Sequence, residues 1–150
     1  MSIQFNEYID KYSQTINQTV TSKGITVTAE KVVCDGSNLY VPYIIKKDTK
    51  FNEEPLSTNI TISDTNTVDF KEDSNLWSKG SLEGTFVDEY TFVGVQIIFL
   101  DYLTYDVPDE FIMKTSFDYI EPVRSDEWNF EFLVKVNLNA NSKMNINKIS

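Results

Sequence analysis

The chain has 150 residues, with 23 acidic and 13 basic side chains, no histidine, and a formal net charge of −10 at pH 7. This length favours a single domain that can bury a substantial core. A uniformly acidic surface repels phosphate, so the charge argues against nucleic acid and anionic lipid as partners. The lack of histidine excludes Ser-His-Asp and Cys-His catalysis and the usual zinc sites.

The composition favours strands over helices, because aromatic and β-branched residues are plentiful while alanine is scarce. No apolar run is long enough to span a membrane, so we expect no direct insertion of this chain into one. Cys34 is the only cysteine, and therefore no intrachain disulfide can form. We expect its thiol to be buried beside a turn, since the sequence shows no basic neighbourhood that would make it reactive.

Residues 2–16 have the spacing of an amphipathic helix. Its apolar face would carry Phe5, Tyr8, Ile9, Tyr12 and Ile16. We expect this short helix to pack across an open end of a sheet. A membrane-surface helix is disfavoured, because the polar face is not basic.

Residues 24–45 predict a β-hairpin whose pattern recurs along the chain. From Ile25 to Ala29 apolar and polar residues alternate, as in a strand buried on one side. The alternation breaks at Lys31, where we expect a bulge. Asp35-Gly36 tolerates positive φ and can reverse the chain. The returning strand would bury Leu39, Val41, Tyr43 and Ile45.

Further strands are predicted over residues 17–23, 56–63, 67–71, 81–87, 90–100, 111–119 and 128–138. A turn at Asp64-Thr65-Asn66 would join the second of these to the third. The segment 90–100 is apolar on both faces, which places it centrally in a sheet. The clearest alternation is the last, with an inward face of Trp128, Phe130, Phe132, Val134, Val136 and Leu138.

Eight or nine short strands without βαβ alternation predict an all-β fold. We expect an antiparallel immunoglobulin-like β-sandwich with a short N-terminal helix, although the Cys-Trp-Cys hallmark is missing; a jelly roll is the alternative. Residues 1–138 would form this single domain. Residues 139–150, rich in Asn and Lys, read as a polar tail, a truncated strand or a linker to a missing C-terminal domain, in a chain excised from a longer protein.

No residue can be nominated as catalytic, and we predict no enzyme, no cofactor and no metal site. Asp64, Asn66 and Asp69 resemble part of a calcium loop, but the central glycine and the twelfth-position glutamate of an EF-hand are not in place. A hydrolase built on a carboxylate pair is a further hypothesis. Among so many acidic residues, such a pair carries almost no information.

Two places could hold a ligand. Trp77 would either cover the core, which we favour, or stack against a ligand. The segment 101–110 contains Tyr102, Tyr105 and Asp106 among further carboxylates, a combination that can hold a sugar or a cation. The favoured alternative is a connection between two layers, with both tyrosines covering the core.

Residues Gly24–Thr28, followed by Val32–Val41, carry a resemblance to a known family, as does the ending Trp128–Phe132. The chain resembles the domain of unknown function in the extracytoplasmic region of anti-sigma-factor-like (sigma-factor negative effector) membrane proteins of Gram-positive bacteria. The resemblance implies an immunoglobulin-like domain outside the cell, tethered by a membrane helix upstream of residue 1. It also implies a sigma factor bound by a cytoplasmic segment that this chain lacks, and it supplies no catalytic residues.

From these observations we expect a non-catalytic sensor or interaction domain on the extracellular face of the membrane. Its partner would be an extracellular protein or a glycan. The alternative is a carbohydrate-binding or adhesion module that uses Trp77, Tyr102 and Tyr105 as stacking platforms.

Overall fold

The computed structural model describes residues 3–51, 58–72, 74–100 and 107–140. In these residues it contains the helix α1 (Ile3–Tyr12), the strands β1 (Gln14–Ser22), β2 (Ile25–Cys34), β3 (Asn38–Lys47), β4 (Asn59–Val68), β5 (Ser81–Asp88), β6 (Thr91–Phe99), β7 (Glu110–Ile120) and β8 (Val123–Lys135), and the short 3-10 helix η1 (Leu138–Ala140).

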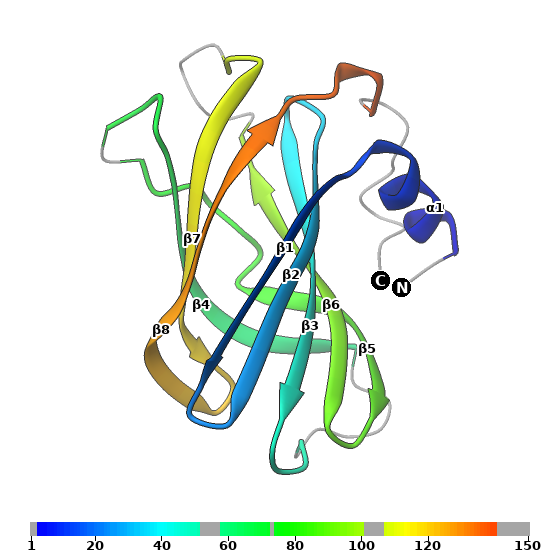
Figure 1. Cartoon of the computed structure of the whole chain (residues 1–150), viewed down its shortest axis with the longest axis vertical. Helices are drawn as coiled ribbons and strands as arrows, with labels where there is room; N and C mark the ends of the chain where they lie inside the picture. The colour runs from blue at the N-terminus through cyan, green and yellow to red at the C-terminus, as the bar shows by residue number, and fades with distance from the viewer. Residues whose placement is uncertain (1–2, 52–57, 73, 101–106, 141–150) are drawn as a thin grey trace.

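The eight strands form one antiparallel sheet in the order β1-β2-β3-β6-β5-β4-β7-β8. The sheet curves until its two edge strands, β1 and β8, run side by side (Figure 1). The predicted all-β antiparallel fold with an N-terminal helix is confirmed. So is the central place of the segment 90–100, because β6 lies between β3 and β5.

Strand β4 connects the two layers of the structure. Its first residues, Asn59–Thr61, pair with β5, and the remainder, Ile62–Val68, pairs with β7. The register shifts between Ser63 and Asp64, which allows the strand to bend from one layer into the other. The sandwich is therefore made by one continuous sheet that folds over its own core.

The predicted hairpin is confirmed as β2 and β3. The pairing shifts between Ala29 and Val33, which places the expected bulge around Lys31. At the turn, the Asp35 carboxylate accepts hydrogen bonds from the main-chain amides of Ser37 and Asn38 at 2.9 and 2.8 Å. Gly36, between Asp35 and Ser37, adopts a φ of 95°, a conformation that favours glycine.

The main core lies between the two layers and contains the predicted inward faces of most strands. Tyr43 of β3 packs edge-on against Phe117 of β7, with ring centroids 5.2 Å apart, and Trp128 of β8 is fully buried. The predicted inward residues of the hairpin and of the last strand that are buried there are Ile25, Val27, Ala29, Leu39, Val41, Tyr43, Ile45, Trp128, Phe130, Phe132 and Val134. Phe111, Met113, Thr115 and Phe117 of β7 are buried as well.

A second, smaller core lies on the outer face of the sheet, where α1 covers β2, β3 and β6. Phe5, Tyr8 and Ile9 of the helix are buried there against Tyr40. Ala140 of η1 is also buried in this cluster, so the packed domain extends to the end of the described residues. The helix thus covers a face of the sheet instead of an open end.

Several predicted boundaries are corrected. Residue Ile16 belongs to β1 and not to the helix, which ends at Tyr12, and β8 ends at Lys135, leaving Leu138 in η1 with 68% of its surface exposed. The predicted turn at residues 64–66 does not exist, because β4 continues through it; positions 56 and 57 of that predicted strand lie outside the described residues.

The error in β4 has a physical cause. Asp64 and Asn66 are residue types that favour turns, and no local signal distinguishes a turn from a strand that carries them inward. In the structure they take part in a hydrogen-bond network inside the main core, with Gln96 of β6 and Thr115 of β7. Tertiary partners therefore override the local preference.

Candidate functional site

The candidate site is the seam where β1 and β8 meet. These strands are the two edges of the sheet, and in the described part of the chain no main-chain strand pairing joins one to the other. An edge strand presents main-chain amide and carbonyl groups that require partners. How the seam satisfies those groups decides what the site can do.

At one end the seam is closed by direct contact. The hydroxyl groups of Ser22 and Ser125 are 2.6 Å apart. Close by, the Trp128 indole donates a hydrogen bond of 3.1 Å to the main-chain carbonyl of Ile25 on β2. Ser22 and Trp128 are both buried, so this end is firmly packed.

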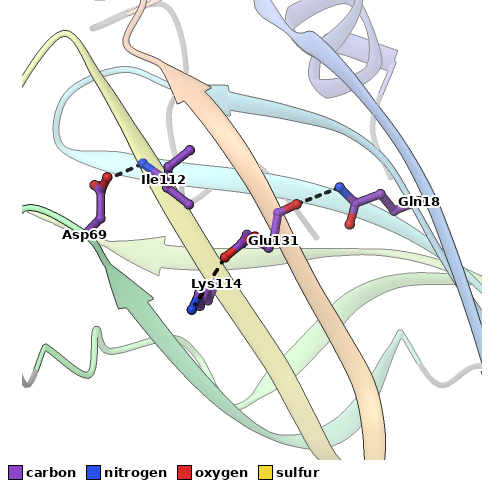
Figure 2. Close-up of polar contacts among 5 residues, drawn as sticks. All are labelled: Gln18, Asp69, Ile112, Lys114 and Glu131. Carbon is purple, nitrogen blue, oxygen red and sulfur yellow. Dashed lines mark hydrogen bonds and ion pairs between the residues drawn. The ribbon is translucent and has the colours of Figure 1, made fainter.

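At the other end, two glutamine side chains bridge the strands. The Gln14 amide donates to the carbonyl of Leu133 and accepts from the main-chain amide of Lys135, each at 2.6 Å. The Gln18 amide donates to the carbonyl of Glu131 at 2.7 Å, as Figure 2 shows. The primary amides of these glutamines thus occupy positions on the β8 edge that a neighbouring strand would otherwise fill.

A bulge in β1 is associated with this opening. Gln14 and Thr15 pair with Val32 and Lys31, and the pairing resumes only at Gln18, so the strand carries one extra residue. Within the bulge, Asn17 has a φ of 51°, a left-handed conformation that asparagine tolerates better than most residues.

The result is a groove of about 510 Å³ between the two strands. It is lined by Gln14, Thr15, Ile16, Gln18, Glu131, Phe132, Leu133 and Lys135. Both apolar and polar groups are therefore available to a bound molecule. The groove extends along the strands, in the direction that an extended chain would take.

The charges around the groove are unequal. The Glu131 carboxylate already pairs with Lys114 of β7 at 3.5 Å (Figure 2). Lys135 forms no ion pair with a described residue, and Leu133 leaves 41% of its surface exposed. An apolar group and an unneutralised cation therefore lie two residues apart on one strand.

A buried polar network lies apart from the groove, inside the main core. The Tyr43 hydroxyl donates to the Gln96 side chain at 2.7 Å, and Gln96 in turn donates to the Asp64 carboxylate at 2.7 Å. Burial raises the pKa of Tyr43 well above its usual value, and the negative charge of Asp64 adds to this effect.

Further donors complete this network, because Asp64 also accepts hydrogen bonds from Asn66 and Ser78 at 3.0 and 2.9 Å. Its donors and acceptors satisfy one another, which is typical of a network that stabilises a fold. Asp69, the third residue of the suspected calcium loop, is occupied elsewhere and accepts a hydrogen bond from the amide of Ile112 at 3.0 Å (Figure 2).

Of the sequence-predicted ligand residues the structure describes Trp77, which is not among the residues that line the groove. Trp77 is 71% exposed, which corrects the prediction that it covers the core; it follows the buried Leu76, and its main-chain carbonyl accepts a hydrogen bond from the amide of Phe99 at the end of β6. Tyr102, Tyr105 and Asp106 lie outside the described residues.

Sequence reasoning missed Gln14, Gln18 and Leu133. A signal was present, because the core-facing positions of β1 include Gln14, Gln18 and Ser22 where a buried strand would carry apolar residues. Polar residues at such positions require partners. The sequence does not show that those partners are on β8.

The described residues contain no cluster of three or more acidic, cysteine or histidine side chains that could hold a metal ion. Their helices include none with the length and apolar character needed to cross a membrane.

Residues 2–47, from α1 to β3, match a protein family described as a domain of unknown function (DUF4179). The predicted resemblance to a family of domains of unknown function is thus confirmed over these residues. No curated protein matches the chain.

Among solved structures, the chain is similar to the crystal structure of a conserved domain protein from Bacillus anthracis, with a TM-score of 0.57 and 19% sequence identity. The similarity covers 84% of this chain but only 42% of that protein. At this identity it shows the fold alone. The fold described above is therefore also found within a longer bacterial protein.

Proposed function

We propose that this chain is a non-catalytic interaction or sensor domain of a membrane-anchored regulatory protein, and that it binds its partner through the groove between β1 and β8. The groove is the observation that carries the proposal. It combines an exposed leucine, a lysine without an ion-pair partner among the described residues, and main-chain groups held only by side-chain amides. These are groups that recognise another protein.

The location and the regulatory role rest on the sequence resemblance. The motif Gly24–Thr28 and Val32–Val41 forms most of β2 and part of β3. By the same resemblance, the domain lies on the extracellular face of the membrane, with its anchor before residue 1. A cytoplasmic segment outside this chain binds the sigma factor.

The experiment uses the full-length protein in its own cells with a reporter of the sigma factor. Leu133→Arg places a bulky charge in the groove, and we expect it to change the reporter response. Val87→Arg, at a residue that is 62% exposed on another part of the surface, serves as the matched control and should leave the response unchanged.

Two outcomes would contradict the proposal. One is an identical reporter response for Leu133→Arg and the wild type while both proteins reach the cell surface. The other is a cell-wall pull-down with the domain that recovers no partner although the intact protein still regulates its sigma factor.

The second candidate function is a carbohydrate-binding or adhesion module, which the exposure of Trp77 favours. An indole that is 71% exposed can serve as a platform for a sugar ring. Binding on a glycan array that is lost in Trp77→Ala, but kept in Tyr90→Ala, would support this function. An array without signal would exclude it.

A further inference from the structure

We infer that the groove between β1 and β8 binds an extended peptide segment of a partner protein, which adds to β8 as a further strand. The inference rests on the proposed interaction function and specifies its partner. The segment carries an apolar residue opposite Leu133 and an acidic residue opposite Lys135. Three features of the groove support it.

The first feature is the pattern of main-chain groups on β8. The carbonyls of Glu131 and Leu133 and the amide of Lys135 all point towards β1, two residues apart. This is the spacing at which a strand edge exchanges hydrogen bonds with a neighbour. All three groups are held by glutamine amides, whose chemistry is that of a peptide group.

The second feature is the way the β8 edge is held. Side-chain amides of β1, and not its main-chain groups, bond to Glu131, Leu133 and Lys135. Each glutamine bond contributes little net stability, because its groups would otherwise bond to water. A peptide strand can therefore displace the side chains of Gln14 and Gln18 and form the same bonds with its own main chain.

The third feature is the side-chain chemistry of β8. The side chains of Leu133 and Lys135 are both exposed and lie on the same face of the strand. Directly opposed residues on paired strands contact each other, and opposite charges across a pair are favourable. Glu131 is already paired with Lys114, so its carboxylate does not require a basic residue in the peptide.

The probes are short fluorescein-labelled peptides of alternating threonine and valine, acetylated and amidated at their ends, with either an aspartate or a lysine at one central valine position, so that the residue two positions away on the same face is a valine. Fluorescence anisotropy with the purified chain measures binding. We expect saturable binding, with the aspartate peptide preferred about threefold over the lysine peptide. Lys135→Glu should reverse this preference.

A third peptide tests the main-chain contacts. It has the aspartate sequence with N-methyl groups on alternate amides, which removes donors but keeps every side chain. We expect its affinity to fall by about tenfold or more, because several strand hydrogen bonds are lost. Equal binding of the methylated and unmethylated peptides would overturn the inference.

Variants of the chain test the role of the glutamines. Gln14→Ala combined with Gln18→Ala leaves the β8 edge vacant, and we expect the aspartate peptide to bind about threefold more tightly. Gln4→Ala, at an exposed residue of α1, is the matched control and should bind as the wild type does. Weaker binding by the double variant, with its fold intact by circular dichroism, would contradict the inference.

A disulfide across the closed end of the seam distinguishes two ways of binding. The peptide either binds in the groove of the intact fold or binds only after β1 and β8 have separated. The hydroxyls of Ser22 and Ser125 are 2.6 Å apart, so Ser22→Cys with Ser125→Cys can form a cross-link there. We expect the oxidised variant to bind the aspartate peptide as tightly as the reduced one. Loss of binding on oxidation would show that the peptide requires an opened sheet, contrary to the inference.

Failure of this inference is distinguishable from failure of the proposed function. If no peptide binds but Leu133→Arg still changes the reporter response, the groove serves an interaction without strand addition, and only the inference is lost. If the unlabelled chain instead self-associates in sedimentation experiments and the double glutamine variant does so more strongly, the occupant is a second copy, which also overturns it.

Discussion

At the scale of single residues, one buried side chain fixes how three strands are placed relative to one another. Gln96 is completely buried, and it connects the Tyr43 hydroxyl on one side to the Asp64 carboxylate on the other. The three residues come from β3, β6 and β4, so one side chain fixes the relative position of three strands. A buried polar group of this kind is costly to leave without a partner.

We therefore expect Gln96→Leu to lower the free energy of unfolding by about 2–4 kcal/mol, because Tyr43 and Asp64 both lose a hydrogen bond within the core. Urea denaturation measures the change. Gln4→Leu, on the exposed surface of α1, should change it by less than about 0.5 kcal/mol. Equal stabilities for the two variants would refute a structural role for the network.

Cys34 leads to a prediction about reactivity. Its side chain is 1% exposed, and burial raises the pKa of its thiol to about 12, against a weaker opposing effect of a hydrogen bond from the Gly36 main chain. At about pH 8 almost no thiolate is present, and the sulfur is inaccessible. We expect no reaction of the native chain with an aromatic disulfide reagent and full reaction in denaturant. Reaction of the native chain at the rate of free glutathione would contradict this prediction.

At the scale of elements, the bulge in β1 decides how the sheet ends. Asn17 has positive φ, and the glutamines on either side of it both reach β8. A regular strand would have no such interruption. We regard the bulge as the local feature that keeps the groove open.

This assignment predicts opposite behaviour for two substitutions at Asn17. Asn17→Val should destabilise the chain by about 1–2 kcal/mol, because a β-branched residue is strained in the left-handed region. Asn17→Gly should be close to neutral, since glycine adopts that conformation readily. Thermal or urea unfolding separates the two, and a Val variant as stable as the Gly variant would show that the bulge does not require this backbone conformation.

At the scale of the whole molecule, the two cores bury tyrosines from different elements. Tyr43 lies in the main core and Tyr40 in the smaller core beneath α1. Burial raises the pKa of Tyr40 to about 12, aided by the nearby Asp35 and opposed by a hydrogen bond from Asn38. The pKa of Tyr8 is raised as well, first by burial and then by the same aspartate.

These shifts predict alkaline unfolding. In the unfolded chain a tyrosine ionises near pH 10, whereas in the folded chain these tyrosines stay neutral to higher pH. Their contribution to stability is therefore complete below about pH 10 and declines as the pH rises towards 12, by about 1.4 kcal/mol per pH unit for each such tyrosine.

Urea unfolding between about pH 8 and pH 11, followed together with phenolate absorbance, measures this decline. The fall in stability should coincide with the ionisation of tyrosines released by unfolding. Stability that stays constant up to about pH 11 would contradict the prediction. Tyr90→Phe, at a partly exposed residue, is a control that should leave the pH dependence unchanged.

The sequence by itself determined most of the strands, and the buried faces of those whose alternation is clear. A side chain's direction in a strand depends only on its position, so alternation such as that from Trp128 to Val134 predicts burial correctly without knowledge of the neighbouring strand. The turn at Asp35-Gly36 was also predictable from the sequence, because the positive φ of Gly36 and the hydrogen bond from the Ser37 amide to Asp35 involve only neighbouring residues.

Only the tertiary structure decided the course of β4, the exposure of Trp77 and the closure of the seam. Each depends on groups distant along the chain: Asp64 meets Gln96, and Gln14 meets Leu133 and Lys135 across 119 and 121 positions. Local patterns do not encode such partners, because a polar residue facing inward looks the same in sequence as one in a turn. For this reason no single sequence motif predicts the candidate groove, which forms only where β1 and β8 meet in the fold.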